Sequence, residues 1–446
     1  MSNPKALDGI TVLDLTKVLA GPYCGSILAD FGAEIIKIEP PGRGDDSRSY
    51  GPHLNGGSLY YENLNRGKRG LTLNLKTEEG KQVFRRLAKQ ADVVIENYRP
   101  GVMERFGLGY EALRQINPRL IYGAITGFGS TGPFSQRPGY DIISQAMGGM
   151  MSVTGQEGDP PTRSGNALGD ILGGMNLAIG VLVALQARNV TGEGQYVDVA
   201  LVDSVAASLE QAWQRYFVSG ELPTRHGNSY DAIAPYDSYA AKDGFIVIGC
   251  GNQKLFEILC RELMKKPELV EDERFLSVSR RVKNNKALKR YIEDWLKDYT
   301  VDEAIELVLA HKIPAGPIWS LKELAESEHA RARNMFTEID HPRFGPIKLN
   351  SSPIKLSRTP AEIRAGSPAL GENNEEILGG LGYRRPISCD SEKWASSDGG
   401  RGGTLPRLSG CRACAQRTAP PAGRPGELPD FGRDGRVAIL QGPGYN

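Results

Sequence analysis

The chain has 446 residues, more than one small hydrophobic core can organise, and this length predicts two or three domains. Its 54 Lys and Arg residues nearly balance its 53 Asp and Glu residues, so the net charge of +1 lacks the basic excess of a nucleic-acid or anionic-membrane binder. With 40% hydrophobic and 24% charged residues, the composition is that of a soluble globular protein.

The N-terminal residues show no targeting segment. Met1–Lys5 has neither the apolar core of a secretory signal nor the Arg-rich pattern of a transit peptide. The longest apolar run, Ile171–Leu185, contains three glycines and is shorter than the ~20 residues of a membrane span, so it predicts a core helix. Cys24, Cys250 and Cys260 have no disulfide spacing, which favours a reducing compartment. We expect a cytoplasmic protein with no nucleic-acid or membrane partner.

The first 40 residues predict a strand, a helix and a second strand. Ile10–Leu15 and Glu34–Glu39 are β-branched and apolar, and Tyr23–Gly32 is the helix between them. Such a βαβ unit begins a parallel sheet. The loop Thr16–Pro22 follows the first strand, and open α/β sheets bind ligands at the carboxyl ends of their strands.

Strands and helices continue to alternate up to about residue 205. The further strands predicted are Leu71–Leu75, Asp92–Glu96, Leu120–Thr126 and Tyr196–Leu201. The further helices predicted are Thr77–Gln90 with Thr77 as its cap, Tyr110–Ile116, a long apolar helix ending at Arg188, and Asp203–Phe217. Regular alternation of this kind predicts an α/β fold with a doubly wound parallel sheet.

A glycine-rich loop follows the strand that ends at Thr126. Gly127–Gly132 has the spacing G-x-G-x-x-G of a dinucleotide-binding fingerprint. That fingerprint must open a helix, whereas this loop runs into Pro133 and then Pro138 with no helical periodicity. We therefore do not predict nicotinamide or flavin binding here, although a glycine-rich loop near a ligand remains open.

The pattern changes at Pro235. Asp237–Ile248 is typical of a β-hairpin that turns at Asp243-Gly244, and helices are predicted over 253–264, 283–298 and 301–312. The predicted organisation is a large Rossmann-like domain over 1–205, a linker over 206–235, a smaller α+β domain over 236–315, and a linker over 316–382 that returns to the large domain.

The composition changes again at Tyr383. Gly, Arg, Pro and Ser dominate residues 383–446, and this segment cannot bury enough apolar surface to offset chain entropy, so an atypical, disordered tail is predicted. Cys411 and Cys414 form a C-x-x-C without the second ligand pair of a metal site.

One carboxylate opens the long apolar helix. Asp170 lies between Gly169 and the pair Gly173-Gly174, and these glycines allow another backbone or a ligand to approach closely. Asp is a common N-cap, which is one interpretation. The other is a functional carboxylate at a helix N-terminus, where unpaired N–H groups favour negative charge. The local sequence leaves both open.

Several motifs occur in a fixed order along the chain. They are Leu7-Asp8-Gly9-Ile10, Val18-Leu19-Ala20-Gly21-Pro22, Gly32-Ala33-Glu34-Ile35-Ile36-Lys37-Ile38-Glu39, Asn65-Arg66-Gly67-Lys68-Arg69, Glu96-Asn97-Tyr98-Arg99-Pro100-Gly101, Gly139-Tyr140-Asp141, Gly169-Asp170 and Leu370-Gly371-Glu372-Asn373-Asn374-Glu375. Through them residues 7–382 resemble the family III coenzyme A transferases, which include formyl-CoA transferases and succinyl-CoA-dependent dicarboxylate transferases. Each motif alone is unspecific, and their combination is specific.

The resemblance implies that Asp170 is the nucleophile of a CoA-transferase. The matching Asp of the family moves CoA from an acyl-CoA donor, for example succinyl-CoA, to a free carboxylic acid through mixed anhydrides and an aspartyl-CoA thioester. Tyr140 matches a family tyrosine beside the substrate. We further expect the helix N-terminus to lower the pKa of Asp170, and backbone N–H groups of Val18–Ala20 to stabilise the oxyanion.

The resemblance also implies a set of coenzyme A contacts. Carried over position by position, they are Val18, Leu19, Ala20, Leu73, Asn74, Leu75, Lys76, Asn97, Tyr98, Arg99 and Arg105. Lys76, Arg99 and Arg105 are suited to the phosphates, although each could equally be a solvated surface charge. The family needs no tightly bound cofactor and no metal, since the CoA thioester is a substrate. Its fold is an interlocked homodimer, which we expect here.

Some positions depart from the family pattern. Pro40 replaces a CoA-contacting Arg and Leu19 replaces the Gln of the oxalate enzymes, which argues for an acceptor larger than oxalate. One alternative is an α-methylacyl-CoA racemase, which shares the fold but carries a His at the position of Tyr140; no His lies in 137–142. A second alternative is an inactive, CoA-ester-binding paralogue.

Overall fold

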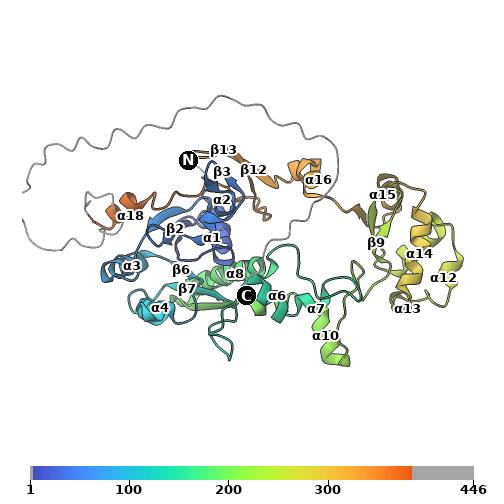
Figure 1. The fold of residues 1–446 in the computed structure, drawn as a ribbon, viewed down its shortest axis with the longest axis horizontal. Coiled ribbons are helices and arrows are strands. Elements are labelled where there is room, and N and C mark those ends of the chain that lie inside the picture. Colours follow the sequence, from blue (N-terminus) through green and yellow to red (C-terminus); the bar gives the residue numbers. More distant parts are fainter. Residues whose placement is uncertain (1–3, 384–446) are drawn as a thin grey trace, which may run out of the picture. The chain divides into compact units, whose positions relative to one another are not determined.

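Residues 4–383 are described by the computed structural model of the chain (Figure 1). Tyr383, the first residue of the predicted tail 383–446, packs against the core that contains Phe84, whereas residues 384–446, with the C-x-x-C of Cys411 and Cys414, lie outside the described residues.

A parallel sheet of six strands is built within residues 4–383, in the order β5-β2-β1-β6-β7-β8. Its strands are β1 (Thr11–Asp14), β2 (Glu34–Glu39), β5 (Arg69–Thr72), β6 (Val93–Glu96), β7 (Ile121–Thr126) and β8 (Tyr196–Ala200). The order reverses at β1, which pairs with β2 on one side and with β6 on the other. The predicted strands are confirmed, except that β5 begins earlier and ends at Thr72 rather than Leu75.

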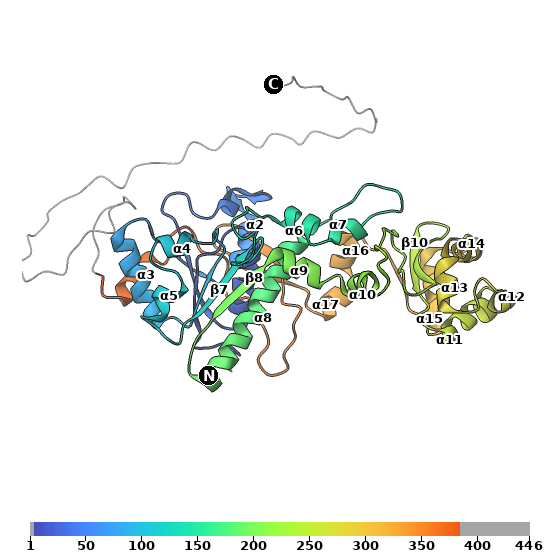
Figure 2. The ribbon, with the colours of Figure 1, turned by 90° about the horizontal axis from the view of Figure 1, so that it is seen from below.

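Helices cover both faces of this sheet, because neighbouring residues of a strand point to opposite sides. Val94 enters a core with helices on one face, and Val93 enters a second core with helices on the other. The helices are α3 (Glu78–Gln90) and α5 (Tyr110–Arg114) in the first core, and α1 (Ala20–Asp30) and α8 (Leu168–Thr191) in the second. The long helix α8 runs beside β7 and β8 (Figure 2).

Helices α1 and α8 touch at a point where only glycine fits. A Cβ on Gly174 would lie 2.4 Å from the carbonyl oxygen of Ala20. The predicted close approach at Gly173-Gly174 is therefore a helix–helix contact. Helix α8 is long and apolar enough to cross a membrane by length and composition, yet its Leu177 and Val181 are fully buried against the sheet, so it is a core helix.

The predicted single helix Asp203–Phe217 is wrong, because two helices occupy this segment: α9 (Leu201–Ala207) and α10 (Glu210–Ser219). Side-chain groups donate hydrogen bonds to carbonyl oxygens in the last turn of α9. The hydroxyl of Ser208 donates to Val205 O at 2.7 Å, and the indole of Trp213 donates to Ala206 O at 2.7 Å. Such local bonds compete with the helix and end it.

Residues 236–317 contain an antiparallel sheet with its own core. The strands are β9 (Tyr236–Ala240), β10 (Phe245–Gly249) and β11 (Ala315–Pro317). The helices that pack with them are α11 (Gln253–Ile258), the π-helix η2 (Leu259–Leu263), α12 (Glu268–Glu271), α13 (Val278–Lys283), α14 (Asn285–Leu296) and α15 (Val301–Ala310). The predicted hairpin is confirmed, and Ala241 N–H donates to Gly244 O across its turn at 2.9 Å. The proposed domain boundaries stay a prediction.

The remaining elements are short. They are the 3-10 helix η1 (Asp46–Ser49), the hairpin strands β3 (His53–Leu54) and β4 (Gly57–Ser58), α2 (Leu59–Asn65), α4 (Val102–Arg105), α6 (Asp141–Met147), α7 (Met150–Val153), α16 (Leu321–Glu326), α17 (Glu328–Ala332), β12 (Phe336–His341), β13 (Gly345–Asn350) and α18 (Asn374–Gly380). The segment before α18 lies against β5: the side chains of Asn373 and Asn374 accept from Gly70 N–H at 2.9 Å and Thr72 N–H at 2.8 Å. Side chains thus satisfy an outer edge of the parallel sheet.

Candidate active site

A cavity of about 230 Å³ opens at the carboxyl ends of β1, β6 and β7. Its walls are Lys17–Ala20 after β1, Asn97–Pro100 after β6, Ile125–Gly127 at the end of β7, the segment Arg137–Tyr140, and the single residues Asp46, Asp170 and Leu201. Strands β1 and β6 are the neighbours at which the strand order reverses, and doubly wound sheets form their ligand crevice at this switch point.

Most of the predicted site residues meet in this cavity. Those that line it are Val18, Leu19, Ala20, Asn97, Tyr98, Arg99, Tyr140 and Asp170. They come from four separate stretches of sequence, which only the fold brings together. The sequence predicted their membership through the resemblance, whereas composition and periodicity indicated the loop after β1 alone.

Asp170 is the third residue of α8, inside its first turn. The N-cap residue of α8 is Ala167, whose side chain makes no capping hydrogen bond. The interpretation of Asp170 as the N-cap is therefore wrong. A different carboxylate takes that place: Asp141 Oδ1 accepts from Gly169 N–H at 2.8 Å and from Asp170 N–H at 3.4 Å. The cap of α8 therefore comes from α6, 28 residues earlier in the chain.

The environment of Asp170 raises its pKa to about 7, chiefly through burial and secondly through the negative charge of Asp141. The expectation that the helix N-terminus would lower this pKa is wrong. The first N–H groups of α8 are already engaged by Asp141, which adds a like charge where a favourable dipole was expected.

Glycine at position 169 is required by the approach of α6. A Cβ there would lie 2.2 Å from the hydroxyl of Ser144 and 3.1 Å from Asp141 Oδ1. Tyr140 is the N-cap residue of the same helix, and 75% of its side chain is exposed. Helix α6 thus brings both Tyr140 and Asp141 to the start of α8.

The carboxylate of Asp170 lies in a cavity at the switch point of the sheet, and comparisons with known proteins show which family this fold belongs to. A family model described as "CoA-transferase family III" matches residues 7–374. The chain belongs to this family. The acetyl-CoA:oxalate CoA-transferase of Acetobacter aceti is 42% identical over 84% of this chain and 96% of the relative. The succinyl-CoA:mesaconate CoA-transferase of Haloarcula hispanica is 41% identical over 86% of this chain and 100% of the relative.

Solved structures agree with these relatives. A CaiB/BaiF family protein from Brucella suis superposes with a TM-score of 0.75 at 39% identity, over 85% of this chain and 100% of that one. The protein is therefore an enzyme, a family III CoA-transferase that moves CoA between an acyl-CoA and a carboxylic acid.

Some coenzyme A contacts predicted for the transferase lie outside the cavity. Leu73–Lys76 follow β5, and Arg105 ends α4. The side chain of Leu75 is buried in the core and does not face a ligand, whereas Asn74 is exposed and its Oδ1 accepts from Lys76 N–H at 3.1 Å. Lys76 and Arg105 are exposed.

The glycine-rich loop of the transferase does not open a helix, since α6 begins only at Asp141. Ser130 donates its N–H to Asp198 at 3.0 Å and its hydroxyl at 2.6 Å, which ties the loop to β8. A Cβ on Gly127 would lie 2.6 Å from the Cα of Gly139. The loop thus draws the segment before Tyr140 against the end of β7.

The predicted use of Val18 N–H as an oxyanion donor is wrong. This group donates to the carboxylate of Asp45, at 3.1 Å from Oδ1 and 3.3 Å from Oδ2. The remaining amides of the loop belong to Leu19 and Ala20, at the start of α1, and no side chain of the described residues caps that helix.

Sequence reasoning missed several residues of the site. Lys17 and Arg137 line the cavity, and the guanidinium of Arg137 lies 3.9 Å from the ring centroid of Phe134. Burial and the charge of Asp170 raise the pKa of Tyr60 to about 12, so this phenol near Asp170 stays protonated. In the sequence, Tyr60 could have been found from the tyrosine pair Tyr60-Tyr61, which lies near one of the family motifs.

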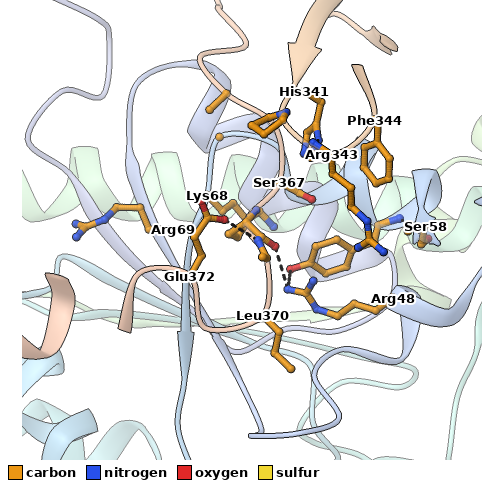
Figure 3. A pocket seen from close by; sticks show the side chains of 18 of the residues that line it. Arg48, Ser58, Lys68, Arg69, His341, Arg343, Phe344, Ser367, Leu370 and Glu372 are labelled. Carbon is orange, nitrogen blue, oxygen red and sulfur yellow. Dashed lines mark hydrogen bonds between the residues drawn. The ribbon is translucent and has the colours of Figure 1, made fainter. Parts of the chain in front are cut away.

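A second cavity, of about 720 Å³, is larger but holds none of the predicted site residues (Figure 3). Two of its cations are compensated by carboxylates: Arg48 pairs with Glu39 at 2.6 Å, and Lys68 pairs with Asp14 at 2.8 Å. His341, at its rim, pairs with Glu62 at 3.2 Å. The pair of His341 and Glu62 joins the returning C-terminal segment to the N-terminal half of the transferase, and the smaller cavity remains the candidate active site.

Proposed function

We propose that the transferase passes CoA to a dicarboxylic acid through a covalent adduct on Asp170. The observation that carries the proposal is the position of this carboxylate in the switch-point cavity, facing loops that the resemblance assigns to CoA. No His of the chain, all five of which fall within residues 4–383, lines the cavity, which disfavours the racemase alternative.

The proposed steps balance without an external acid or base. An ionised Asp170 oxygen attacks the donor thioester carbonyl, the C–S bond breaks, and CoA thiolate leaves a mixed anhydride. The thiolate attacks the Asp170 carbonyl, releasing the donor acid and leaving an aspartyl-CoA thioester. An acceptor carboxylate attacks this thioester and expels the thiolate. The thiolate then takes the acceptor acyl group from the second anhydride and restores Asp170.

The tetrahedral intermediates carry an oxyanion, which the N–H groups of Leu19 and Ala20 are placed to stabilise. Both residues line the cavity with Asp170, and they stand at the start of the 11-residue helix α1. Uncapped amides at a helix N-terminus are donors for negative charge, and one such donor contributes several kcal/mol, about 10²–10³ in kcat.

Coenzyme A is proposed to lie along the carboxyl edge of the sheet, as a substrate rather than a tightly bound cofactor. Arg99 lines the cavity after β6, while Lys76 follows β5 at the outer end of the same edge. Cations spaced along one edge suit an elongated ligand with several phosphates. No metal takes part in these steps.

The acceptor is proposed to be a dicarboxylic acid, because the two relatives above are named for oxalate and mesaconate, both dicarboxylic acids. The second carboxylate of such an acceptor needs a cation that does not already bind CoA. Lys17 and Arg137, in the cavity wall, are the candidates. The expectation of an acceptor larger than oxalate stays a prediction.

An interlocked, cytoplasmic homodimer completes the proposal. Helix α8 exposes an apolar stripe, made of Met175, Ile179, Leu182 and Val183, on the side away from the sheet. A helix that is apolar all round is normally covered on every side, so this stripe supports a partner surface. The described cysteines, Cys24, Cys250 and Cys260, are free and buried, which suits a reducing compartment.

Adduct formation on Asp170 is the test. The wild-type protein is first incubated with succinyl-CoA and then treated with hydroxylamine or borohydride, which labels an activated carboxyl group. We expect this label on the peptide that contains Asp170. The Asp170→Asn variant should carry no label. The Asp203→Asn variant, which changes the acid in the first turn of α9, should be labelled like the wild type. Label absent from wild type would contradict the proposal, and α-proton exchange in deuterated water would revive the racemase.

A further inference from the structure

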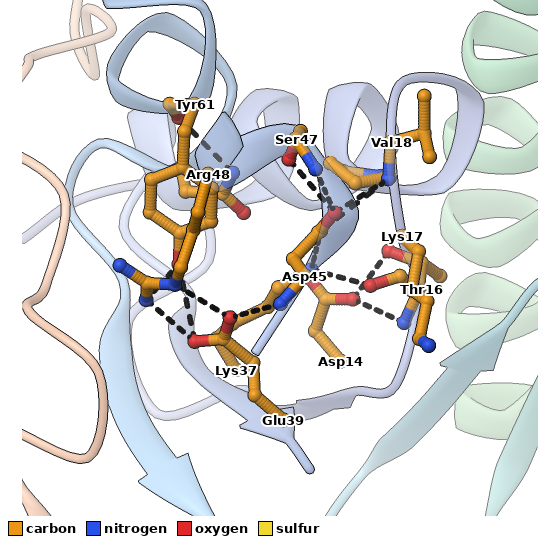
Figure 4. Close-up of polar contacts among 12 residues, drawn as sticks. Asp14, Thr16, Lys17, Val18, Lys37, Glu39, Asp45, Ser47, Arg48 and Tyr61 are labelled. Carbon is orange, nitrogen blue, oxygen red and sulfur yellow. Dashed lines mark hydrogen bonds and ion pairs between the residues drawn. The ribbon is translucent and has the colours of Figure 1, made fainter. Parts of the chain in front are cut away.

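Side chains hold nearly every backbone polar group of the loop Thr16–Val18, between β1 and α1 (Figure 4). Thr16 N–H donates to Asp14 Oδ1 at 2.9 Å, and Thr16 O accepts from the ammonium of Lys37. Val18 N–H donates to Asp45. A loop whose backbone groups are fixed one by one cannot relax locally, because each movement would break a hydrogen bond.

Asn97 completes this set from the neighbouring strand. Its Oδ1 accepts from Lys17 N–H at 2.8 Å, and its Nδ2 donates to Lys17 O at 2.8 Å. One side chain thus satisfies both polar groups of one residue and joins the loop after β6 to the loop after β1. These two loops are the walls of the switch-point cavity.

Val18 sits in a left-handed conformation, with φ of +66°. A β-branched residue rarely adopts it, and such strain costs on the order of 1–3 kcal/mol unless the surroundings enforce it. The enforcing contacts are the bonds of Val18 N–H to Asp45 and of Lys17 to Asn97. The turn at Val18 leads directly into Leu19, the N-cap residue of α1, and Ala20, its first residue, both on the cavity wall.

The charges beneath the loop are buried and paired. Lys37 and Asp45 lie 3.1 Å apart with fully buried side chains. Burial alone would raise the pKa of Asp45, but the charge of Lys37 and hydrogen bonds from Ser47 and Val18 hold it below its ordinary value. The carboxylate therefore remains ionised and a strong acceptor over the whole physiological range.

We propose that Asp45 and Asn97 are positioning residues, which hold Val18 in its left-handed turn so that the amides of Leu19 and Ala20 face the reacting carbonyl. This inference rests on the proposed function of Asp170. It also changes the role expected of Asn97: both ends of its amide are occupied by Lys17, so it shapes the oxyanion site rather than binding CoA through its side chain.

Asn97→Asp is the test variant, because it keeps the oxygen that accepts from Lys17 N–H and replaces the donor that meets Lys17 O. The matched control is Asn117→Asp: Asn117 Oδ1 accepts from Arg119 N–H at 3.1 Å and its Nδ2 donates to Ala88 O and Ala91 O, before the opposite end of β7. We expect Asn97→Asp to lower kcat about 10–100-fold, with the KM for acyl-CoA within about threefold. Asn117→Asp should retain wild-type kinetics per folded molecule.

A raised KM with unchanged kcat would instead make Asn97 a direct CoA ligand and overturn the inference. Unchanged kinetics would overturn it as well. A wild-type protein without transferase activity would contradict the proposed function alone, since a second measurement tests the loop without substrate. Amide hydrogen exchange over residues 16–20 is expected to accelerate in Asn97→Asp and Asp45→Asn but not in Asn117→Asp, and equal exchange in all proteins would refute the positioning role.

Discussion

Two carboxylates share the start of α8 and differ in what surrounds them. Asp141 accepts from the backbone N–H of Gly169, whereas Asp170 lines the cavity and forms no ion pair with any residue of the range 4–383. The pKa of Asp170 is consequently raised to about 7 by burial and by Asp141. The resting enzyme holds its proposed nucleophile near the midpoint of its titration at neutral pH.

The rate should follow the ionised fraction of Asp170. Because only the carboxylate attacks a thioester, and its pKa is about 7, kcat/KM is expected to fall about tenfold per pH unit below about pH 6 and to level off above about pH 8. A pH profile of kcat/KM for the acyl-CoA measures this. A flat profile between pH 5 and 8 would show that the pKa of Asp170 lies outside this range.

Asp141→Asn should move that profile to lower pH. The substitution removes the negative charge that contributes to the raised pKa of Asp170, while an Asn can still cap α8. Burial is unchanged, so the midpoint is expected to shift only part of the way. Thermal unfolding serves as the control, with a loss below about 1 kcal/mol, because Asn and Asp are similar caps.

Stability should depend on pH through the same group. The folded-state pKa of Asp170 is raised above its ordinary value of 3.8, so the folded form binds the proton more tightly, and stability falls as pH rises from about 4 to about 7. Asp170→Asn is therefore expected to stabilise the protein by about 1–3 kcal/mol at pH 8 and hardly at pH 4. Urea unfolding at both pH values measures this, with Asp203→Asn as control.

At the scale of elements, the sequence predicted what local pattern determines. Glu34–Glu39 was placed with its observed bounds, and Thr77 caps α3 through Gly80 N–H at 3.1 Å. What failed depended on contacts between distant segments. The cap of α8 comes from Asp141, 28 residues earlier in the chain. A one-dimensional pattern contains no signal for such contacts.

Helices α1 and α8 contribute Ala20 and Asp170 to the cavity wall, and the contact between these helices can be tested at Gly174. Gly174→Ala would place a methyl group 2.4 Å from Ala20 O, a backbone atom that cannot move without α1. We expect a loss of about 1–3 kcal/mol in stability together with reduced activity. Gly379→Ala in α18 meets nothing within 4 Å and should gain about 0.5–1 kcal/mol. Equal unfolding free energies in the two variants would contradict the close helix contact.

At the scale of the whole molecule, the exposed stripe on α8 predicts self-association. Val183 is 62% exposed on a helix whose other side is core. Val183→Asp is expected to shift the sedimenting mass from dimer toward monomer at micromolar concentration, because a charge would be buried in an apolar interface. Leu309→Asp, at an exposed position of α15, is the control. A monomeric wild-type protein would refute the homodimer.

The site as a whole was predictable only through the combination of motifs. Local sequence favoured an N-cap role for Asp170 and left a functional carboxylate open, and the family resemblance then favoured the functional role. Neither indicated that Asn97 bonds to Lys17, or that Val18 N–H is occupied by Asp45, because these bonds join loops from different strands. The sequence therefore predicted which residues line the cavity better than it predicted the contacts that each of them makes.

The raised pKa of Asp170 has a consequence for chemical labelling. Diazo reagents esterify carboxylic acids only in their protonated form: the diazo carbon takes the acid proton, the carboxylate then attacks that carbon, and N₂ leaves. At neutral pH ordinary surface carboxylates are ionised and react slowly, whereas about half of Asp170 is protonated. Glu96 has a pKa of about 8 but is only 7% exposed, beyond the reach of a bulky reagent. The carboxyl group of Asp170, the proposed nucleophile, is thus open to selective esterification by a diazo probe.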